Sequence, residues 1–180
     1  MKKIIIFLIF AISSNMVFAQ GTELSPSASK KVKRILEEEK QYQKNKEMLE
    51  NRDFVLQADY LQDKWGNRVF VNTMINFVAV DSTIAVIQIG SDYRKGPNGV
   101  GGITAKGHIS GWKLGENQKS KTFNLSFTVT TNIGVYDLLF LIGPSETSTA
   151  RLEGYTGGQL TFEGKLVPYS ESSSFEGQSR

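Results

Sequence analysis

The chain has 180 residues, no cysteine and a formal net charge of +3 at neutral pH. Its length fits one domain with its own hydrophobic core, and the absence of cysteine excludes disulfides and thiolate-bound metals. Lys2 and Lys3 supply two of the excess positive charges, and they lie in a segment that we expect to be removed. The remaining chain is nearly neutral, so it lacks the basic surface that nucleic-acid binding requires.

The N-terminus has the order of a secretory signal peptide. Two lysines precede an apolar run at residues 4–12, and the small residues Val17 and Ala19 follow at the positions that signal peptidase reads. The run is shorter than the about 20 apolar residues that span a bilayer. We therefore predict a signal peptide at residues 1–19, a mature chain that begins at Gln20 without a transmembrane segment, and a periplasmic or secreted location.

Residues 20–53 are predicted to form a helical segment. It contains no glycine after Ser25, which can cap a helix. Apolar residues recur every seven positions and form one narrow stripe of Ala28, Ile35, Tyr42 and Leu49. Two interpretations are open: a coiled-coil or partner-binding helix, or a solvated helix that lays its stripe on its own domain. Glu39 and Lys46 interrupt the stripe and favour the second, and we expect the β domain to fold without this helix.

From Phe54 onward the sequence consists of short β-rich runs separated by turn residues. Alternation is clearest where Phe123, Leu125, Phe127 and Val129 fall on one face of a strand. This pattern predicts about eight antiparallel strands within residues 54–168, which form a barrel or a sandwich. The expected fold class is thus all-β with an N-terminal α-helix. The polar tail at residues 169–180 lacks apolar periodicity, and we expect it to be disordered.

Four blocks of this β region occur in a fixed order: FVLQADYLQDKWGNRVFVN, NFVAVDSTIAVIQIG, NGVGGITAKGHISGWKL and LTFEGKLVP. Together they resemble a family of secreted bacterial domains, the domain of unknown function 4251. The resemblance covers roughly residues 54–168. It implies export in Gram-negative bacteria of the gut-anaerobe type and a β-rich domain after an N-terminal helix, and it supplies no catalytic residues.

The glycine-rich stretch GPNGVGGITAKG, at residues 96–107, invites comparison with phosphate-binding loops. A P-loop would need Lys and Ser or Thr where this chain continues with His and Ile, and a dinucleotide fingerprint would need glycine at Thr104. Both motifs also open a helix, whereas a strand is expected here. We predict a structural loop with a turn at Asn98-Gly99. Either Gly101 or Gly102 should have positive φ or lie against another strand.

Candidate catalytic groups are sparse. His108 is the only histidine, and strand alternation directs it away from the core as an exposed strand residue. Two carboxylates on one face could serve as a glycosidase pair, and the candidates are Asp59, Asp63, Asp81, Asp137 and Glu153. We assign no catalytic residue, metal or cofactor. A carboxylate-dependent hydrolase acting on a glycan or cell-wall substrate is the alternative function.

The favoured hypothesis is a non-catalytic binding domain. Small β-barrels hold ligands in the interior or at the mouth. Tyr93, Arg94 and Asn98 border the glycine-rich loop, and Trp112 ends the strand that follows it. These four residues are candidate ligand-binding residues, with core packing of Trp112 as the competing interpretation. The partner would be a small ligand or an envelope component, and the oligomeric state stays open.

Overall fold

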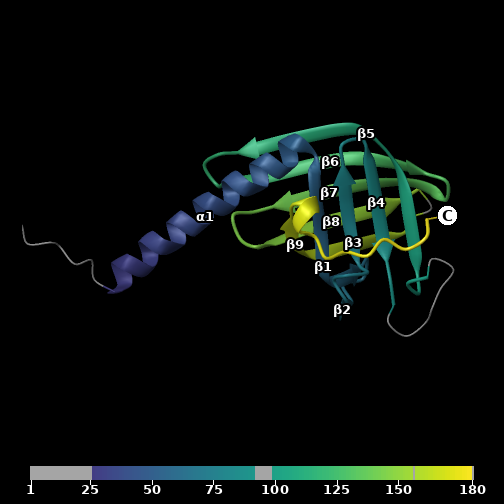
Figure 1. Cartoon of the computed structure of the whole chain (residues 1–180), viewed down its shortest axis with the longest axis horizontal. Coiled ribbons are helices and arrows are strands. Elements are labelled where there is room, and N and C mark those ends of the chain that lie inside the picture. Colours follow the sequence, from purple (N-terminus) through teal and green to yellow (C-terminus); the bar gives the residue numbers. More distant parts are fainter. Residues whose placement is uncertain (1–25, 92–98, 156, 180) are drawn as a thin grey trace, which may run out of the picture.

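The computed structural model of the protein describes residues 26–91, 99–155 and 157–179. Within these residues one α-helix precedes nine strands, and the strands pair with one another in antiparallel fashion (Figure 1). The elements are α1 (Pro26–Asn51), β1 (Asp53–Asp63), β2 (Arg68–Phe70), β3 (Phe77–Asp81), β4 (Ile84–Ile89), β5 (Ile103–Asn117), β6 (Thr122–Thr131), β7 (Gly134–Ile142), β8 (Thr147–Gly154), β9 (Gln159–Val167) and the 3-10 helix η1 (Tyr169–Glu171).

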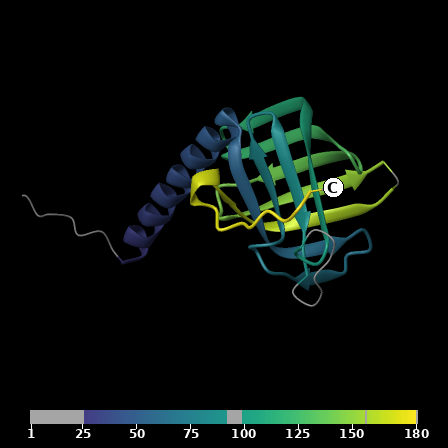
Figure 2. The ribbon, with the colours of Figure 1, turned by 45° about the vertical axis from the view of Figure 1, so that its right-hand side comes forward.

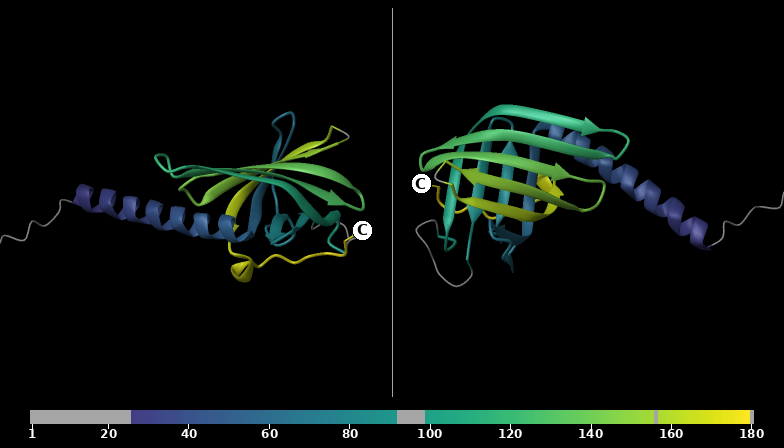
Figure 3. Two further views of the ribbon diagram at one scale, coloured as in Figure 1. Left: turned by 90° about the horizontal axis from the view of Figure 1, so that it is seen from above. Right: turned by 180° about the vertical axis from the view of Figure 1, so that it is seen from behind.

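The sheet closes on itself through β1. Strands β3 to β9 each pair with their neighbours in the chain, and β1 pairs with β3 on one edge and with β9 on the other. Eight strands therefore form a closed barrel, seen from two sides in Figure 3. The ninth, β2, pairs with the second half of β1. The predicted fold class is confirmed, and the closure decides for a barrel over a sandwich.

Large apolar side chains fill the barrel. Phe54, Phe123, Phe140 and Phe162 are fully buried, and Leu125 lies among them in the main core cluster. The rings of Phe54 and Phe140 meet edge to face, with centroids 5.7 Å apart. Burial of each such side chain contributes about 1.5–3 kcal/mol. This packing makes the interior a hydrophobic core, so the inside of the barrel is not the ligand chamber that the sequence left open.

The two halves of α1 have different surroundings. The first half projects away from the barrel (Figure 1), and its apolar residues Ile35 and Leu36 are exposed. The second half covers one end of the barrel, where Tyr42, Met48 and Leu49 are buried in the main core cluster. The prediction that the apolar stripe lies on its own domain is confirmed for this half. The expectation that the β domain folds without the helix does not fit this packing, because three helical side chains are part of the core.

The C-terminal segment 169–179 lies along the barrel wall, contrary to the expected disorder. After η1 it crosses β1, β3 and β4 (yellow in Figure 1). The buried Gln88 amide donates to the carbonyl oxygen of Phe175 at 2.8 Å and accepts from the backbone N–H of Gly177 at 2.7 Å. The tail lacks apolar periodicity of its own, which is why the sequence predicted disorder. The barrel, however, has a second apolar surface on its outer wall, formed by Val55, Phe77, Ala79 and Val86, and the tail lies along this wall (Figure 1).

Candidate functional site

A protruding hairpin is the most conspicuous surface feature of the protein. β1 extends to Asp63, the chain turns, and β2 returns along it, with Leu61 opposite Val69 and Tyr60 opposite Phe70. We call residues 60–70 the flange. Residues 60–63 still pair with β9 in the barrel sheet, whereas the turn and β2 extend from the barrel, as Figures 2 and 3 show. Seven consecutive residues, 64–70, are exposed.

The turn of the flange is held by the Asp63 carboxylate. Its Oδ1 accepts the backbone N–H groups of Trp65 and Asn67, each at 2.9 Å, and its Oδ2 accepts from the Asn67 side chain at 2.7 Å. These bonds, the Asn67 side-chain bond above all, hold the pKa of Asp63 below its usual value. Gly66 supplies the positive φ of 90° that the turn requires. A short Asp-to-Asn span thus fixes the shape of the tip.

This ordered hairpin presents bare apolar side chains to solvent. Trp65 is 76% exposed, Phe70 is 75% exposed and Val69 is 56% exposed. Scattered apolar residues on a surface are ordinary, whereas several large ones on one hairpin make it a candidate interaction site. The hydrogen bond from its backbone N–H to Asp63 keeps Trp65 at the tip of the hairpin.

Two cations accompany the aromatic rings of the flange. The Lys64 ammonium lies 4.7 Å from the ring centroid of Trp65. The Arg68 guanidinium lies 3.6 Å from the ring of Tyr60 and forms an ion pair of 2.6 Å with Glu163 on β9. The flange can therefore offer apolar surface and positive charge to the same partner.

The flange is not evident from the sequence, because KWGNR, with its Gly-Asn pair, has the composition of a simple turn. Turn positions usually carry small polar residues. Trp65 in the turn and Phe70 in a strand of three residues were the available signals. Their exposure depends on β2 pairing only with β1, outside the closed barrel, and the sequence does not reveal that arrangement.

The predicted ligand-binding residues fall in two places. Tyr93, Arg94 and Asn98 lie outside the described residues, so their role stays a prediction. Trp112 lies at a β-bulge in β5, where Gly111 has a φ of 64° and the pairing with β6 shifts register. Its ring stacks on Phe127, with centroids 5.2 Å apart, and the Arg52 guanidinium lies 4.7 Å over the Trp112 ring. This partly buried ring packs against the main core, as the competing interpretation required.

The described part of the glycine-rich loop has the predicted structural character. Gly99 and Gly101 have φ values of 79° and 78°. A Cβ built on Gly102 would lie 1.9 Å from the carbonyl oxygen of Ile89, so this glycine is in close contact with the end of β4. A strand, β5, follows the loop where a phosphate-binding motif would open a helix. The prediction for Gly101 and Gly102 is confirmed.

The register of β7 and β8 brings two of the five candidate carboxylates together. Asp137 lies directly opposite Glu153. Both line a shallow depression of about 290 Å³ on the outer wall, beside Lys113 and Arg151. Asp137 accepts a hydrogen bond of 2.6 Å from Thr128, and Glu153 pairs with Arg151 at 2.9 Å. Both carboxylates are exposed and already have partners.

The other candidate groups lie apart from this depression. Asp63 holds the flange turn, and Asp81 accepts a hydrogen bond from Ser82 between β3 and β4. Asp59 lies in β1, and His108 is exposed on β5 as predicted. Among the residues that the structure describes, no three His, Asp or Glu side chains gather as a metal site would require.

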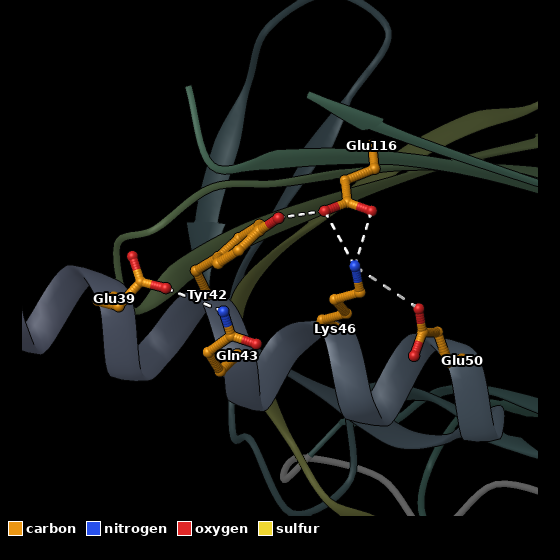
Figure 4. Close-up of polar contacts among 6 residues, drawn as sticks. All are labelled: Glu39, Tyr42, Gln43, Lys46, Glu50 and Glu116. Carbon is orange, nitrogen blue, oxygen red and sulfur yellow. Dashed lines mark hydrogen bonds and ion pairs between the residues drawn. The ribbon is translucent and has the colours of Figure 1, made fainter. Parts of the chain in front are cut away.

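A polar cluster joins α1 to β5 and has a structural role (Figure 4). The Tyr42 hydroxyl donates to Glu116, and the Lys46 ammonium lies 3.1 Å from the same carboxylate. The Tyr42 hydrogen bond, followed by that of Lys46, lowers the pKa of Glu116. The Glu116 hydrogen bond is in turn the largest cause that raises the pKa of Tyr42 and of Lys46. The cluster fastens the helix over the barrel end.

No helix within the described ranges has the length and apolar content needed to cross a membrane.

Comparison with known proteins places the chain in a family. No curated protein matches it. A crystal structure of a DUF4251 family protein from Bacteroides eggerthii DSM 20697 is similar, with a TM-score of 0.62 and 25% identity over 73% of this chain and 90% of that chain. The family model for the domain of unknown function DUF4251 matches residues 36–166, from the second half of α1 to β9. The resemblance of the four sequence blocks is thereby confirmed, and the chain belongs to the DUF4251 family.

Proposed function

We propose that the protein is an exported, non-catalytic binding domain that attaches to a component of the cell envelope through the flange. The observation that carries this proposal is the exposure of Trp65 and Phe70, at 76% and 75%, on a hairpin whose turn is fixed by hydrogen bonds. Keeping such side chains in water is unfavourable, and covering them with a partner recovers that free energy.

The packing of the barrel favours an external partner over an enclosed small ligand. Phe54, Phe140 and their neighbours fill the interior. The two faces of Trp112 are occupied by Phe127 and Arg52. A small ligand at the glycine-rich loop would depend on Tyr93, Arg94 and Asn98, and the described residues give it no further support.

Export rests on the sequence of the N-terminus. The basic start, the apolar run at residues 4–12 and the small residues up to Ala19 have the order of a secretory signal. An exported chain would meet membranes, glycans and other envelope proteins. We therefore expect the partner of the flange to be a component of the envelope.

Sedimentation with isolated envelopes tests this function. The exported chain should bind envelope fragments, and the double variant Trp65→Ser/Phe70→Ser should bind at least about tenfold more weakly because it loses the apolar surface of the flange. Leu141→Ser is the matched control, since Leu141 is 53% exposed on the barrel wall at β7. Equal binding by the double variant and the control would contradict the proposal, provided that both unfold at the parent temperature.

A carboxylate-dependent hydrolase is the second candidate function, favoured by the opposed pair of Asp137 and Glu153. Residues directly opposite in antiparallel strands have Cβ atoms about 4.5–5.5 Å apart, which suits the carboxyl spacing of about 5–5.5 Å in retaining glycosidases. Both carboxylates are exposed on an open wall, in a shallow depression that would not exclude water, and this favours the binding domain instead.

Reducing-end release from cell-wall and storage glycans separates the two functions. Hydrolysis that is lost in both Asp137→Asn and Glu153→Gln, but kept in Trp65→Ser/Phe70→Ser, would establish the hydrolase. We expect no release above the blank from the parent protein.

A further inference from the structure

We propose that the partner of the flange is the surface of an anionic lipid bilayer, into which the hairpin tip inserts. This inference rests on the proposed function, because it names the chemistry of the envelope component. Three features of the flange support it: apolar side chains on both faces, cations beside the aromatic rings, and a tip that is already ordered.

The apolar side chains point to both sides of the hairpin. Val69 lies opposite Leu61, which is buried in the barrel core, and Phe70 lies opposite Tyr60, whose side chain belongs to the other face. Adjacent strand residues direct their side chains to opposite faces. A flat protein surface would cover either Val69 or Phe70. The boundary between lipid headgroups and acyl chains surrounds an inserted tip, so it would cover both residues and Trp65 together.

The flange carries two cations beside its aromatic rings and one carboxylate, Asp63, which is already engaged by the backbone of the turn. Lys64 lies over the ring of Trp65, and Arg68 lies over the ring of Tyr60. A long basic side chain can keep its charge among the headgroups while the neighbouring ring goes deeper. Tryptophan and tyrosine are enriched at this depth of membranes. Arg68 shares its charge with Glu163 at 2.6 Å, so Lys64 has the larger part in attracting an anionic surface.

The tip needs little ordering when it inserts. The Asp63 carboxylate already binds the backbone of Trp65 and Asn67, each at 2.9 Å. The Gln62 side chain donates to the carbonyl oxygen of Gly66 at 3.2 Å. A hairpin fixed in this way presents Trp65 without the loss of conformational freedom that opposes binding by a flexible loop.

Vesicle binding tests the inference with the exported chain. Vesicles of phosphatidylethanolamine and phosphatidylglycerol should bind the protein at least about tenfold more tightly than vesicles of phosphatidylcholine. The emission of Trp65 should shift to the blue on binding. Trp65→Phe should abolish that shift, because the second tryptophan, Trp112, is packed against the core.

Three variants define the contact. Val69→Ser/Phe70→Ser should weaken binding to anionic vesicles by at least about tenfold. Lys64→Gln should weaken it by about fivefold, as expected for one cation near an anionic surface, and should leave binding to neutral vesicles unchanged. Leu141→Ser on the barrel wall should bind like the parent.

Two results would overturn the inference, and only the first of them would leave the proposed function standing. One is the absence of vesicle binding while envelope binding still depends on the flange, which would point to a protein or glycan partner. The other is a dimer in analytical ultracentrifugation that Phe70→Ser dissociates, which would show that a second copy covers the flange. If envelopes do not bind at all, the proposed function fails with the inference.

Discussion

At the scale of single residues, Gly102 shows how a backbone position shapes the barrel. The residue lies where the glycine-rich loop enters β5, and a Cβ there would lie 1.9 Å from the carbonyl oxygen of Ile89. That distance is far inside van der Waals contact, so β4 and the start of β5 could not keep their separation with a larger residue. Gly99 differs, because its φ of 79° requires the left-handed region while the space around it is open.

These two glycines predict different costs of an alanine substitution. Gly99→Ala should lower the free energy of unfolding by about 1–2 kcal/mol, the cost of a left-handed conformation. Gly102→Ala should lower it by at least about 3 kcal/mol, because backbone must move as in an overpacked core. Urea unfolding of both variants measures the difference. A phosphate-binding loop would instead show a nucleotide-dependent melting temperature in the parent, with both variants as stable as the parent.

At the scale of elements, α1 is divided between the core and solvent. The family model begins at Leu36, close to the point where the helix reaches the barrel, and the side chains that the structure describes before it, at 27 and 29–35, are exposed. Tyr42 stacks on Phe123, with ring centroids 5.2 Å apart, and Leu49 is fully buried. The helical segment predicted at residues 20–53 is therefore not separate from the β domain. The second half of α1 is part of the core, and its first half projects into solvent.

Two truncations test this division. Deletion of residues 21–36 should leave the thermal transition within a few degrees of the parent, because the side chains that the structure describes in this range are exposed. Deletion of residues 21–51 removes Tyr42, Met48 and Leu49 from the core. Each buried side chain contributes about 1.5–3 kcal/mol, so the total approaches the about 5–15 kcal/mol net stability of a domain. The longer deletion should lose its cooperative transition. If both truncated proteins instead unfold cooperatively at the parent's temperature, the helix is dispensable for folding.

The polar cluster of the helix predicts a pH dependence. The pKa of Glu116 is lowered in the folded protein, chiefly by the Tyr42 hydroxyl. Its stabilising effect is therefore present above the unfolded pKa, near 4.5, and is lost as the pH falls through the lower folded value. The pKa of Tyr42 and of Lys46 is raised, so their contribution is present below about pH 10 and is lost as the pH rises through the folded values.

We expect Glu116→Gln to be less stable than the parent at neutral pH and to approach the parent as the pH falls through the lowered folded pKa of Glu116. Tyr42→Phe keeps the ring on Phe123 and removes the hydroxyl. The folded pKa of Glu116 should then lie closer to the unfolded value, so the loss of stability in acid should be smaller and should end at higher pH. Urea unfolding across the acid range measures both effects. A constant difference between parent and Glu116→Gln at all pH values would show that this carboxylate does not fasten the helix.

At the scale of the whole molecule, two described segments lie outside the family match. The family match covers residues 36–166, and the first half of α1 and the C-terminal segment lie beyond it. The C-terminal segment covers apolar residues on the outer wall and pairs Glu176 with Lys106 at 3.0 Å. The second apolar surface of the barrel is therefore covered by the chain itself, whereas the flange is left bare.

The location of the whole protein gives the last prediction. We expect the chain found in the envelope or the medium to begin at Gln20, because cleavage after Ala19 fits the signal pattern. Intact mass spectrometry of the exported protein measures the start directly. A chain that retains residues 1–19 outside the cytoplasm would contradict the predicted cleavage.

Much of the fold followed from local patterns in the sequence. Alternation such as Phe123, Leu125 and Phe127 places successive side chains on opposite faces, and it predicted the antiparallel strands that the barrel contains. The helix, the structural glycines and the exposure of His108 were predicted for the same reason, since each depends on a few neighbouring residues.

The tertiary structure decided three features: the closure of the barrel, which distant residues lie side by side, and which apolar residues are exposed. The pairing of β1 with β9 joins residues more than a hundred positions apart, and no local pattern encodes that contact. The same holds for the C-terminal segment on Gln88, for Asp137 beside Glu153, and for the burial of Trp112 against Phe127. The flange is the clearest case. Trp65 and Phe70 are apolar residues like those of the core, and only the position of β2 outside the closed barrel leaves them exposed.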